Sequence, residues 1–79
     1  MPRLIYARFF PPLGLQLGWD DGTVGEIDLR PRLFGVMFEP LRDPSFAAQV
    51  FVDEYGAPTW PNGADLAPDA LYREVKNER

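Results

Sequence analysis

Cysteine and histidine are both missing from this sequence of 79 residues. Their absence excludes disulfide bonds, thiolate nucleophiles and Cys/His zinc sites, and it removes the usual general base for chemistry at neutral pH. The hydroxyl groups of Ser45, Thr23 and Thr59 have no histidine to activate them, and Lys76 is the single lysine. We therefore expect no enzymatic activity and no cofactor.

Long apolar runs and an excess of positive charge are missing as well. No segment approaches the roughly 20 apolar residues that span a bilayer, and the first residues do not lead into a signal peptide. The 8 basic residues face 12 acidic ones, for a net charge of −4, whereas proteins that bind phosphate backbones present basic surfaces. We expect a soluble, cytoplasmic protein with no membrane contact, for which nucleic acid is a disfavoured partner. Scattered positions are favoured over a single basic face for Arg3, Arg8, Arg30 and Arg32.

Aromatic residues are the main source of a core in so short a chain. Six Phe, three Tyr and two Trp make up 14% of the sequence, and each large ring buries much apolar area. Because 79 residues leave room for one core only, we predict a single domain over residues 1–79.

The N-terminal third predicts a meander of three antiparallel strands. Residues 4–10 are rich in strand formers and precede Pro11-Pro12, which ends a strand. Residues 13–19 alternate apolar side chains with glycine or polar residues, and this period of two places Trp19 in the core with three leucines. The Asp21-Gly22 pair is typical of a tight hairpin turn, and the residues after it form the return strand.

Short helical segments are expected next. The apolar run of residues 33–38 has neither helical nor strand spacing, and we interpret it as a short helical turn broken at Gly35. Residues 39–44 are interpreted as a connector. Asp43 is expected to cap a helix of one to two turns that Pro44 opens, since proline suits the first helical position.

A second hairpin and a C-terminal helix complete the predicted fold. Residues 50–53 and 57–60 flank a turn at Gly56, and Pro58 suggests an edge position. A last helix is expected from about Pro68 to Lys76. The predicted class is α+β: a small antiparallel sheet, made of a three-stranded meander plus a second hairpin, with two or three short helices that include the C-terminal one.

The segment Trp60-Pro61-Asn62-Gly63-Ala64-Asp65-Leu66 specifies a rigid turn before the last helix. Pro61 presets φ, and Asn62-Gly63 tolerates left-handed backbone. Asp65 is interpreted as a side chain that stabilises the turn, and this interpretation is favoured over a functional carboxylate.

Motifs along nearly the whole chain carry a resemblance to one known family. They are Asp21-Gly22, Ile27-Asp28-Leu29, Pro31, Phe38, Pro40-Leu41, Asp43, Phe46, the segment from Trp60 to Leu66, and Leu71-Tyr72. Together they resemble the bacterial family catalogued as domain of unknown function 2442. The resemblance implies a small α+β fold and no established activity. Similar proteins are often encoded beside another short protein, which suggests toxin and antitoxin partners, and some carry an added helix-turn-helix that this sequence lacks.

Four acidic residues lie around the first hairpin: Asp20, Asp21, Glu26 and Asp28. Calcium and magnesium ions need several convergent oxygen ligands, but the spacing here matches no calcium loop. A solvated hairpin is favoured over a metal site, so we expect no bound metal.

Two hypotheses for function follow from these observations. The favoured one is a protein–protein interaction module that binds another small protein or a second copy of itself, with an antitoxin-like partner of a small neighbouring protein as one form. Its surface would combine the apolar run with the edge of the second hairpin, and the candidate residues are Phe34, Phe38, Tyr55 and a half-exposed Trp60. The alternative is a nucleic-acid-associated regulatory domain that uses its arginines against phosphate.

Overall fold

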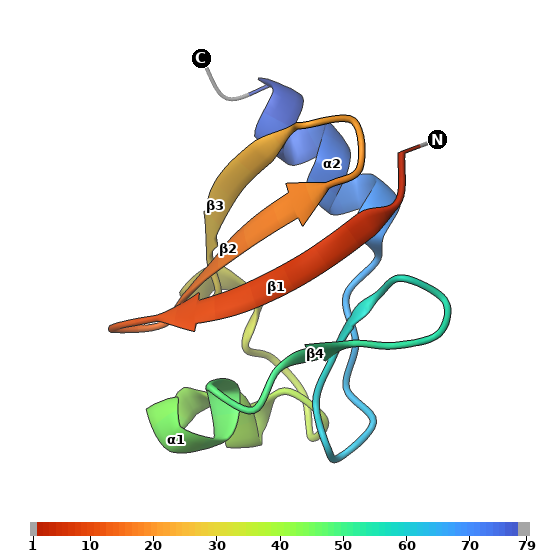
Figure 1. Cartoon of the computed structure of the whole chain (residues 1–79). Helices are drawn as coiled ribbons and strands as arrows, with labels where there is room; N and C mark the ends of the chain where they lie inside the picture. Colours follow the sequence, from red (N-terminus) through yellow and green to blue (C-terminus); the bar gives the residue numbers. More distant parts are fainter. Residues whose placement is uncertain (1, 78–79) are drawn as a thin grey trace.

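Three antiparallel strands form the sheet that organises this protein. The computed structural model describes residues 2–77, so positions 1, 78 and 79 of the predicted domain lie outside it. Strands β1 (Leu4–Phe10), β2 (Gly14–Trp19) and β3 (Val24–Asp28) are adjacent in that order, with β2 at the centre (Figure 1). The predicted meander is confirmed.

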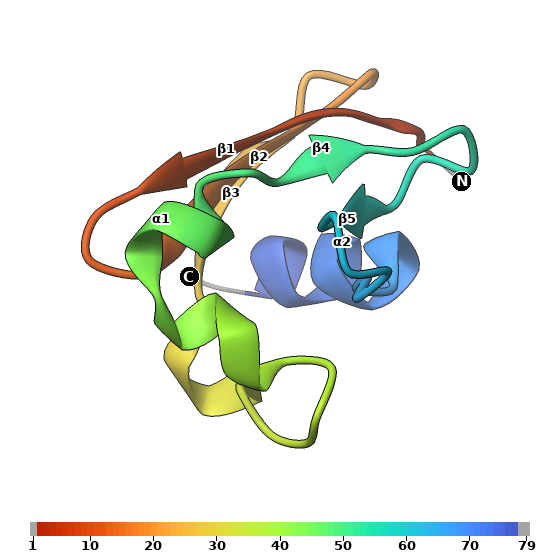
Figure 2. The same ribbon diagram turned by 90° about the horizontal axis from the view of Figure 1, so that it is seen from below.

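The remaining elements follow the sheet in the chain. They are the short 3-10 helices η1 (Arg30–Arg32) and η2 (Glu39–Arg42), helix α1 (Pro44–Ala47), the hairpin strands β4 (Phe51–Val52) and β5 (Pro58–Thr59), and helix α2 (Pro68–Asn77). The sheet forms one layer and α2 lies beneath it (Figure 2). This arrangement confirms the α+β class and the C-terminal helix. No helix within residues 2–77 has the length and apolar character needed to cross a membrane.

The face of the sheet that points toward α2 carries the core. Leu15, Leu17 and Trp19 alternate along β2 and are all buried, as their period of two predicts. Leu71 of α2 and Trp60 belong to the same buried cluster. The core therefore joins the sheet to the helix and to the segment that precedes it.

No described helix or strand covers the opposite, outer face of the sheet (Figures 1 and 2). Two aromatic rings lie against the glycines of this face. Phe10 pairs with Gly14, and Tyr6 pairs with Gly18, across the β1–β2 ladder. A Cβ atom at either glycine would collide with the facing ring. Each ring therefore occupies space that only glycine leaves open.

The segment between β3 and α1 differs from its sequence-based interpretation. Residues 33–38 form a bend and one hydrogen-bonded turn that starts at Gly35, where φ is +82°. The helical turns lie on either side, in η1 and η2, because each has a proline in its first positions. The predicted connector over residues 39–44 is therefore mostly helical. The Asp43 cap is confirmed, since its carboxylate accepts the Ser45 N–H at 3.0 Å.

The second hairpin is confirmed, but its outer side is already occupied. Thr59 of β5 forms an antiparallel bridge with Asp65, and the Leu66 N–H donates to the Pro58 carbonyl at 3.0 Å. On the other side, β4 lies alongside β1 (Figures 1 and 2). The expectation that the edge of this hairpin is open and forms part of a partner surface is therefore wrong.

Helix α2 is tied to the first hairpin through Tyr72. Its ring packs edge to face on Trp19 with the ring centroids 5.3 Å apart, and its hydroxyl donates to Asp21 Oδ2 at 2.7 Å. The hydrogen bond from Tyr72, aided by the Thr23 N–H, holds the pKa of Asp21 below its usual value of 3.8.

Stability is expected to fall in acid through this carboxylate. Because the pKa of Asp21 is lowered by folding, its contribution is fully present above the unfolded pKa of 3.8 and is lost as the pH falls through the folded pKa. Tyr72→Phe removes the hydrogen bond. The difference in urea midpoint between wild type and variant should therefore be largest near neutral pH and shrink below about pH 4. An equal difference at neutral and strongly acid pH would contradict this account.

Candidate functional site

Three exposed apolar side chains gather in the loop between η1 and η2. Phe34, Val36 and Met37 are 71%, 85% and 43% exposed, although side chains of this kind are usually buried. We call residues 34–37 the apolar loop. It projects on the side of the molecule opposite the sheet (Figure 2). A group of adjacent exposed apolar side chains on a small domain is typical of an interaction surface.

Hydrogen bonds from two distant side chains hold the backbone of the apolar loop. Arg42 Nη2 donates to the Leu33 carbonyl at 2.7 Å, just before the loop. Asn62 Nδ2 donates to the Met37 carbonyl at 2.8 Å, at the end of the loop. A loop that is ordered before binding loses less entropy when a partner docks. The exposed side chains are therefore presented on a fixed backbone.

The segment from Trp60 to Leu66, which we call the signature segment, contains a turn that positions the apolar loop. The Gly63 N–H donates to the Trp60 carbonyl at 2.9 Å, and Gly63 has a φ of +91°. Asn62 Oδ1 accepts the Ala64 N–H at 3.1 Å, while the other end of the same amide reaches Met37. The predicted turn is confirmed, and its asparagine links the turn to the candidate site.

Asn62→Ala is expected to lower the free energy of unfolding by about 0.5–1.5 kcal/mol, because exposed hydrogen bonds to Ala64 and Met37 are lost. Amide hydrogen exchange at residues 35–38 should become faster at the same time. Urea unfolding and NMR-detected exchange measure the two effects. Asn77→Ala, at an exposed position of α2, is the control and should leave exchange in the loop unchanged. Unaltered loop exchange in Asn62→Ala would mean that this amide does not position the loop.

Trp60 lies in the interior. Its side chain is 1% exposed, and its Nε1 donates to the Ala47 carbonyl at 2.9 Å. The prediction of a half-exposed Trp60 on a partner surface is therefore wrong. The indole instead joins the signature segment to the end of α1, a contact between residues that are 13 apart in the chain.

The other predicted surface residues do not form one patch. Phe34 lies in the apolar loop, but Phe38 is half-buried against the core. Tyr55 is 82% exposed, yet it lies at the tip of the second hairpin, beside the start of α2. Val36 and Met37 belong to the apolar run that was expected to contribute to the surface, but neither was named as a candidate residue. The signal for them was an apolar run without either regular period, next to a glycine.

Asp65 does not make the predicted turn through its side chain. Its backbone forms the bridge with Thr59. Its exposed carboxylate has no hydrogen bond to any group within residues 2–77, and the side chain that closes the turn is Asn62. The interpretation of Asp65 as a turn-stabilising side chain is therefore wrong.

Acidic side chains around the first hairpin make local hydrogen bonds. Asp20 accepts the Arg3 N–H at 3.1 Å, and Asp28 accepts both the N–H and the guanidinium Nε of Arg30 at 3.0 Å. The Arg30 guanidinium lowers the pKa of Asp28. Within the described part of the chain, no three acidic side chains converge as a metal site would require.

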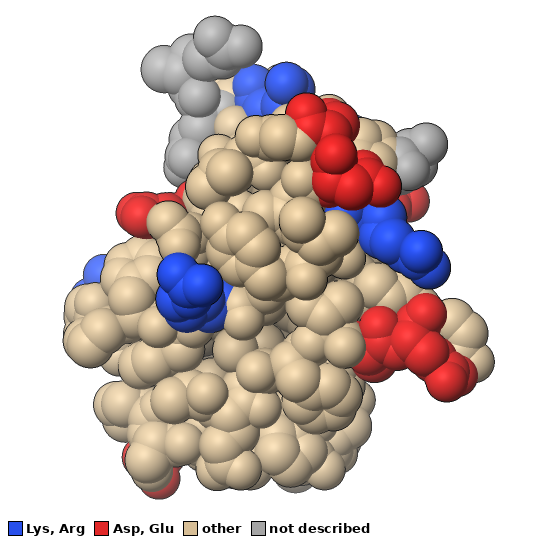
Figure 3. All heavy atoms as spheres, viewed as in Figure 1, with Lys and Arg blue, Asp and Glu red and all other residues tan. Residues whose placement is uncertain are grey.

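The arginine side chains lie apart from one another, and most of them form an ion pair or pack on an aromatic ring. The paired side chains are Arg30 with Asp28, Arg32 with Glu74, and Arg42 with Glu39. Arg8 lies over the Tyr6 ring, 5.4 Å from its centroid. On the face seen in Figure 3, basic side chains occupy separate places and form no single patch. This distribution does not provide the basic stripe that a phosphate backbone prefers.

The chain matches one family model and is similar to a solved protein structure. A family model described as "Protein of unknown function (DUF2442)" matches residues 4–77. The chain is also similar to the crystal structure of a protein from Nitrosomonas europaea ATCC 19718 that is described as a "Putative DNA Binding Protein", with 26% sequence identity and a TM-score of 0.83. That similarity covers 99% of this chain and 51% of the other, so the chain spans about half the length of that protein. No curated protein matches the chain.

Proposed function

This chain belongs to the DUF2442 family of proteins of unknown function, and we propose that it is a protein-interaction module whose contact surface is the apolar loop. The observation that carries the proposal is the exposure of Phe34, Val36 and Met37 on a backbone held by Arg42 and Asn62. Exposed apolar side chains gain free energy when a partner covers them. The fixed loop reduces the entropy that binding costs.

The charge of the chain favours a small basic protein as the partner. A net charge of −4 speeds encounter with a basic surface and disfavours acidic partners. An antitoxin-like role is one form of this function, in which the apolar loop covers the active surface of a small neighbouring protein. Inhibition would then be steric, and it would need no chemistry from this chain.

The test of the apolar loop is the substitution Val36→Asp. We expect it to reduce recovery of the partner at least about tenfold, because a charge in the contact surface must be desolvated without an opposite charge. Capture of the tagged chain from its native cells, with mass spectrometry of the eluate, measures recovery. Light scattering of the purified chain detects a second copy as the partner instead.

A matched control distinguishes an effect specific to the apolar loop from a general effect of placing a charge on exposed apolar surface. Tyr55 is as exposed as Val36 but lies at the tip of the second hairpin, so Tyr55→Asp should leave recovery of the partner unchanged. Both variants should keep the unfolding midpoint of the wild type, because both side chains face solvent. Equal recovery with wild type and Val36→Asp would refute the apolar loop as the contact surface.

A nucleic-acid-associated regulatory domain is the second candidate, and the similarity to the Nitrosomonas protein favours it. This chain corresponds to about half of that protein, which is described as a "Putative DNA Binding Protein". The paired arginines and the acidic charge disfavour direct phosphate contact by this chain, so its part in such a function would be regulatory. Fluorescence anisotropy with labelled duplex DNA is expected to show no binding by residues 1–79. Binding that weakens steeply with added salt would instead give this half a direct role.

A further inference from the structure

Strand β3 has an open edge. The Leu29 N–H donates to the Leu13 carbonyl at 2.9 Å at the end of the β2–β3 ladder. Hydrogen-bonded and non-hydrogen-bonded pairs alternate in an antiparallel ladder. The backbone N–H and C=O groups of the odd-numbered residues of β3 therefore point toward β2, and those of the even-numbered residues point away from it. The outward groups belong to Val24, Glu26 and Asp28. Within residues 2–77 they have no backbone partner, and no strand lies beside this edge (Figure 1).

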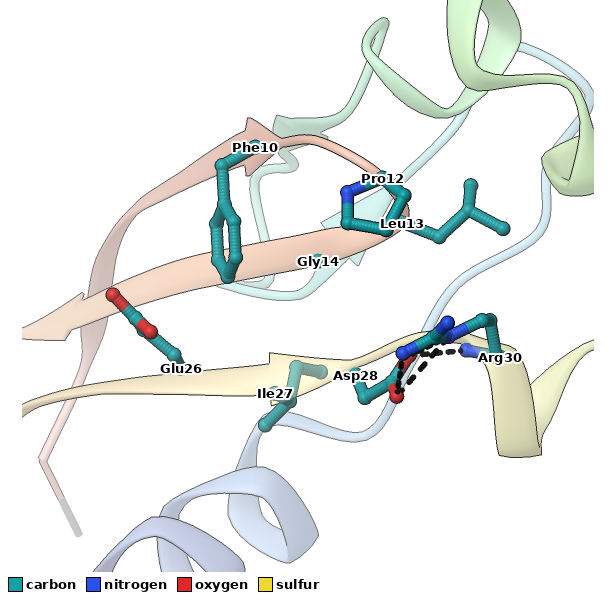
Figure 4. A pocket seen from close by; sticks show the side chains of 8 residues that line it. All are labelled: Phe10, Pro12, Leu13, Gly14, Glu26, Ile27, Asp28 and Arg30. Carbon is teal, nitrogen blue, oxygen red and sulfur yellow. Dashed lines mark hydrogen bonds and ion pairs between the residues drawn. The ribbon is translucent and has the colours of Figure 1, made fainter.

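A hollow of about 290 Å³ lies next to this edge on the outer face of the sheet. Phe10 and Pro12 supply apolar wall, and Gly14 lies at the base (Figure 4). Glu26 lies at one side of the hollow, and Asp28 lies at the other with Arg30 bound to it. The hollow therefore combines an apolar lining with a carboxylate that belongs to the open strand.

Within residues 2–77, Glu26 is the acidic side chain at this hollow that forms no ion pair. The carboxylate of Asp28 is neutralised by Arg30 at 2.9 Å, whereas Glu26 makes no ion pair or hydrogen bond within residues 2–77. A lysine or arginine places its aliphatic stem on apolar surface and its charge at the rim. Its stem would pack on Phe10 and Pro12 while its charged end meets Glu26.

A second copy of the chain does not fit this edge. The side chains of Glu26 and Asp28 both lie on the outer face of the sheet. Antiparallel pairing of two β3 strands would therefore place the acidic side chains of one copy opposite those of the other copy on that face. Like charges opposite each other destabilise a strand pair. The same charges attract a strand that carries lysine or arginine at alternate positions.

We propose that β3 is a strand-addition site for an extended basic segment of a partner protein, with a lysine or arginine side chain seated in the hollow beside Glu26. Backbone hydrogen bonds to Val24, Glu26 and Asp28 supply affinity, and the hollow selects the side chain. The inference rests on the proposed function as an interaction module, but it uses a surface other than the apolar loop.

The probe is a short, end-blocked peptide of alternating threonine and lysine, titrated into the full chain at low salt and followed by NMR of the backbone amides. We expect the largest shifts at residues 24, 26 and 28, and slower hydrogen exchange there in the complex. Glu26→Lys should weaken binding at least about tenfold. Glu54→Lys, at the exposed tip of the second hairpin, makes the same change in net charge and should alter binding less than about threefold.

Two matched peptides test the strand geometry. Methylation of alternate peptide nitrogens along the edge-facing side removes hydrogen-bond donors and should abolish binding, whereas glutamate in place of lysine should abolish it through repulsion. Absent or scattered shifts, or equal weakening by Glu54→Lys and Glu26→Lys, would overturn the site. Val36→Asp should leave the titration unchanged. If Val36→Asp loses the native partner and the peptide causes no shifts at β3 of the wild type, the apolar loop is supported and strand addition is refuted. If Val36→Asp keeps the native partner and the peptide does shift the β3 amides, strand addition is supported and the apolar loop is refuted as the contact surface.

Discussion

Trp60→Ala is expected to lower the free energy of unfolding by about 3–5 kcal/mol. The side chain is 1% exposed, so its removal loses buried apolar area and leaves a cavity between the signature segment and α1. The Ala47 carbonyl also loses the indole N–H that donates to it at 2.9 Å. A domain of this size has only about 5–15 kcal/mol of stability in total, so the variant should unfold at a much lower urea concentration than the wild type.

Urea unfolding followed by circular dichroism measures this loss, and two variants sharpen it. Trp60→Phe keeps most of the buried ring but removes the donor to Ala47, so it should cost less than Trp60→Ala. Tyr55→Ala truncates an aromatic side chain that is 82% exposed and should change stability by less than about 0.5 kcal/mol. Similar unfolding midpoints for Trp60→Ala and Tyr55→Ala would contradict the buried position of Trp60.

Trp60 was predicted to be half-exposed but is buried, and this error shows a feature of the fold that the local sequence does not determine. Its neighbours Pro61, Asn62 and Gly63 specify a turn, and turns usually face solvent. Burial of the indole depends on Ala47 and on α1, which lie outside any local window. The period-two pattern of β2, by contrast, reports burial directly, because alternate side chains share one face of a sheet.

Local chemistry predicted most turns and helix starts for the same reason. Asp43 caps α1 within three residues, and Gly22 and Gly56 adopt the positive φ that their hairpins require. The run of residues 33–38 has no such local rule. Its course is set by Arg42 and by Asn62, a residue 25 positions from the carbonyl that it holds.

The candidate site was predictable only in part. Phe34 was predicted to lie on a contact surface and is exposed, but the run of residues 33–38 was interpreted as a short helical turn, whereas it forms a bend and a turn. Exposure of Val36 depends on the bend that precedes η2, and the open edge of β3 depends on where β5 and the signature segment pair. These features arise from contacts between segments, so composition and spacing do not reveal them.

Gly25→Ala is expected to destabilise the protein by about 1–3 kcal/mol. At most strand positions alanine in place of glycine is neutral or stabilising, because it reduces the entropy of the unfolded chain. Gly25, however, faces α2, and a Cβ atom there would collide with both methyl groups of Val75. The helix must then move away from β3, which also exposes Leu71, a buried residue of the core.

A double-mutant cycle with Val75→Ala tests this contact. Val75→Ala alone should destabilise the protein through lost packing, but in the Gly25→Ala background it also relieves the collision. The two changes together should therefore cost less than the sum of the single costs, with a coupling energy of about 1 kcal/mol or more. Faster hydrogen exchange in α2 of Gly25→Ala should return toward the wild-type rate in the double variant. Additive free energies would show that the helix does not rest on Gly25, and the close approach of α2 to the sheet would then need another explanation.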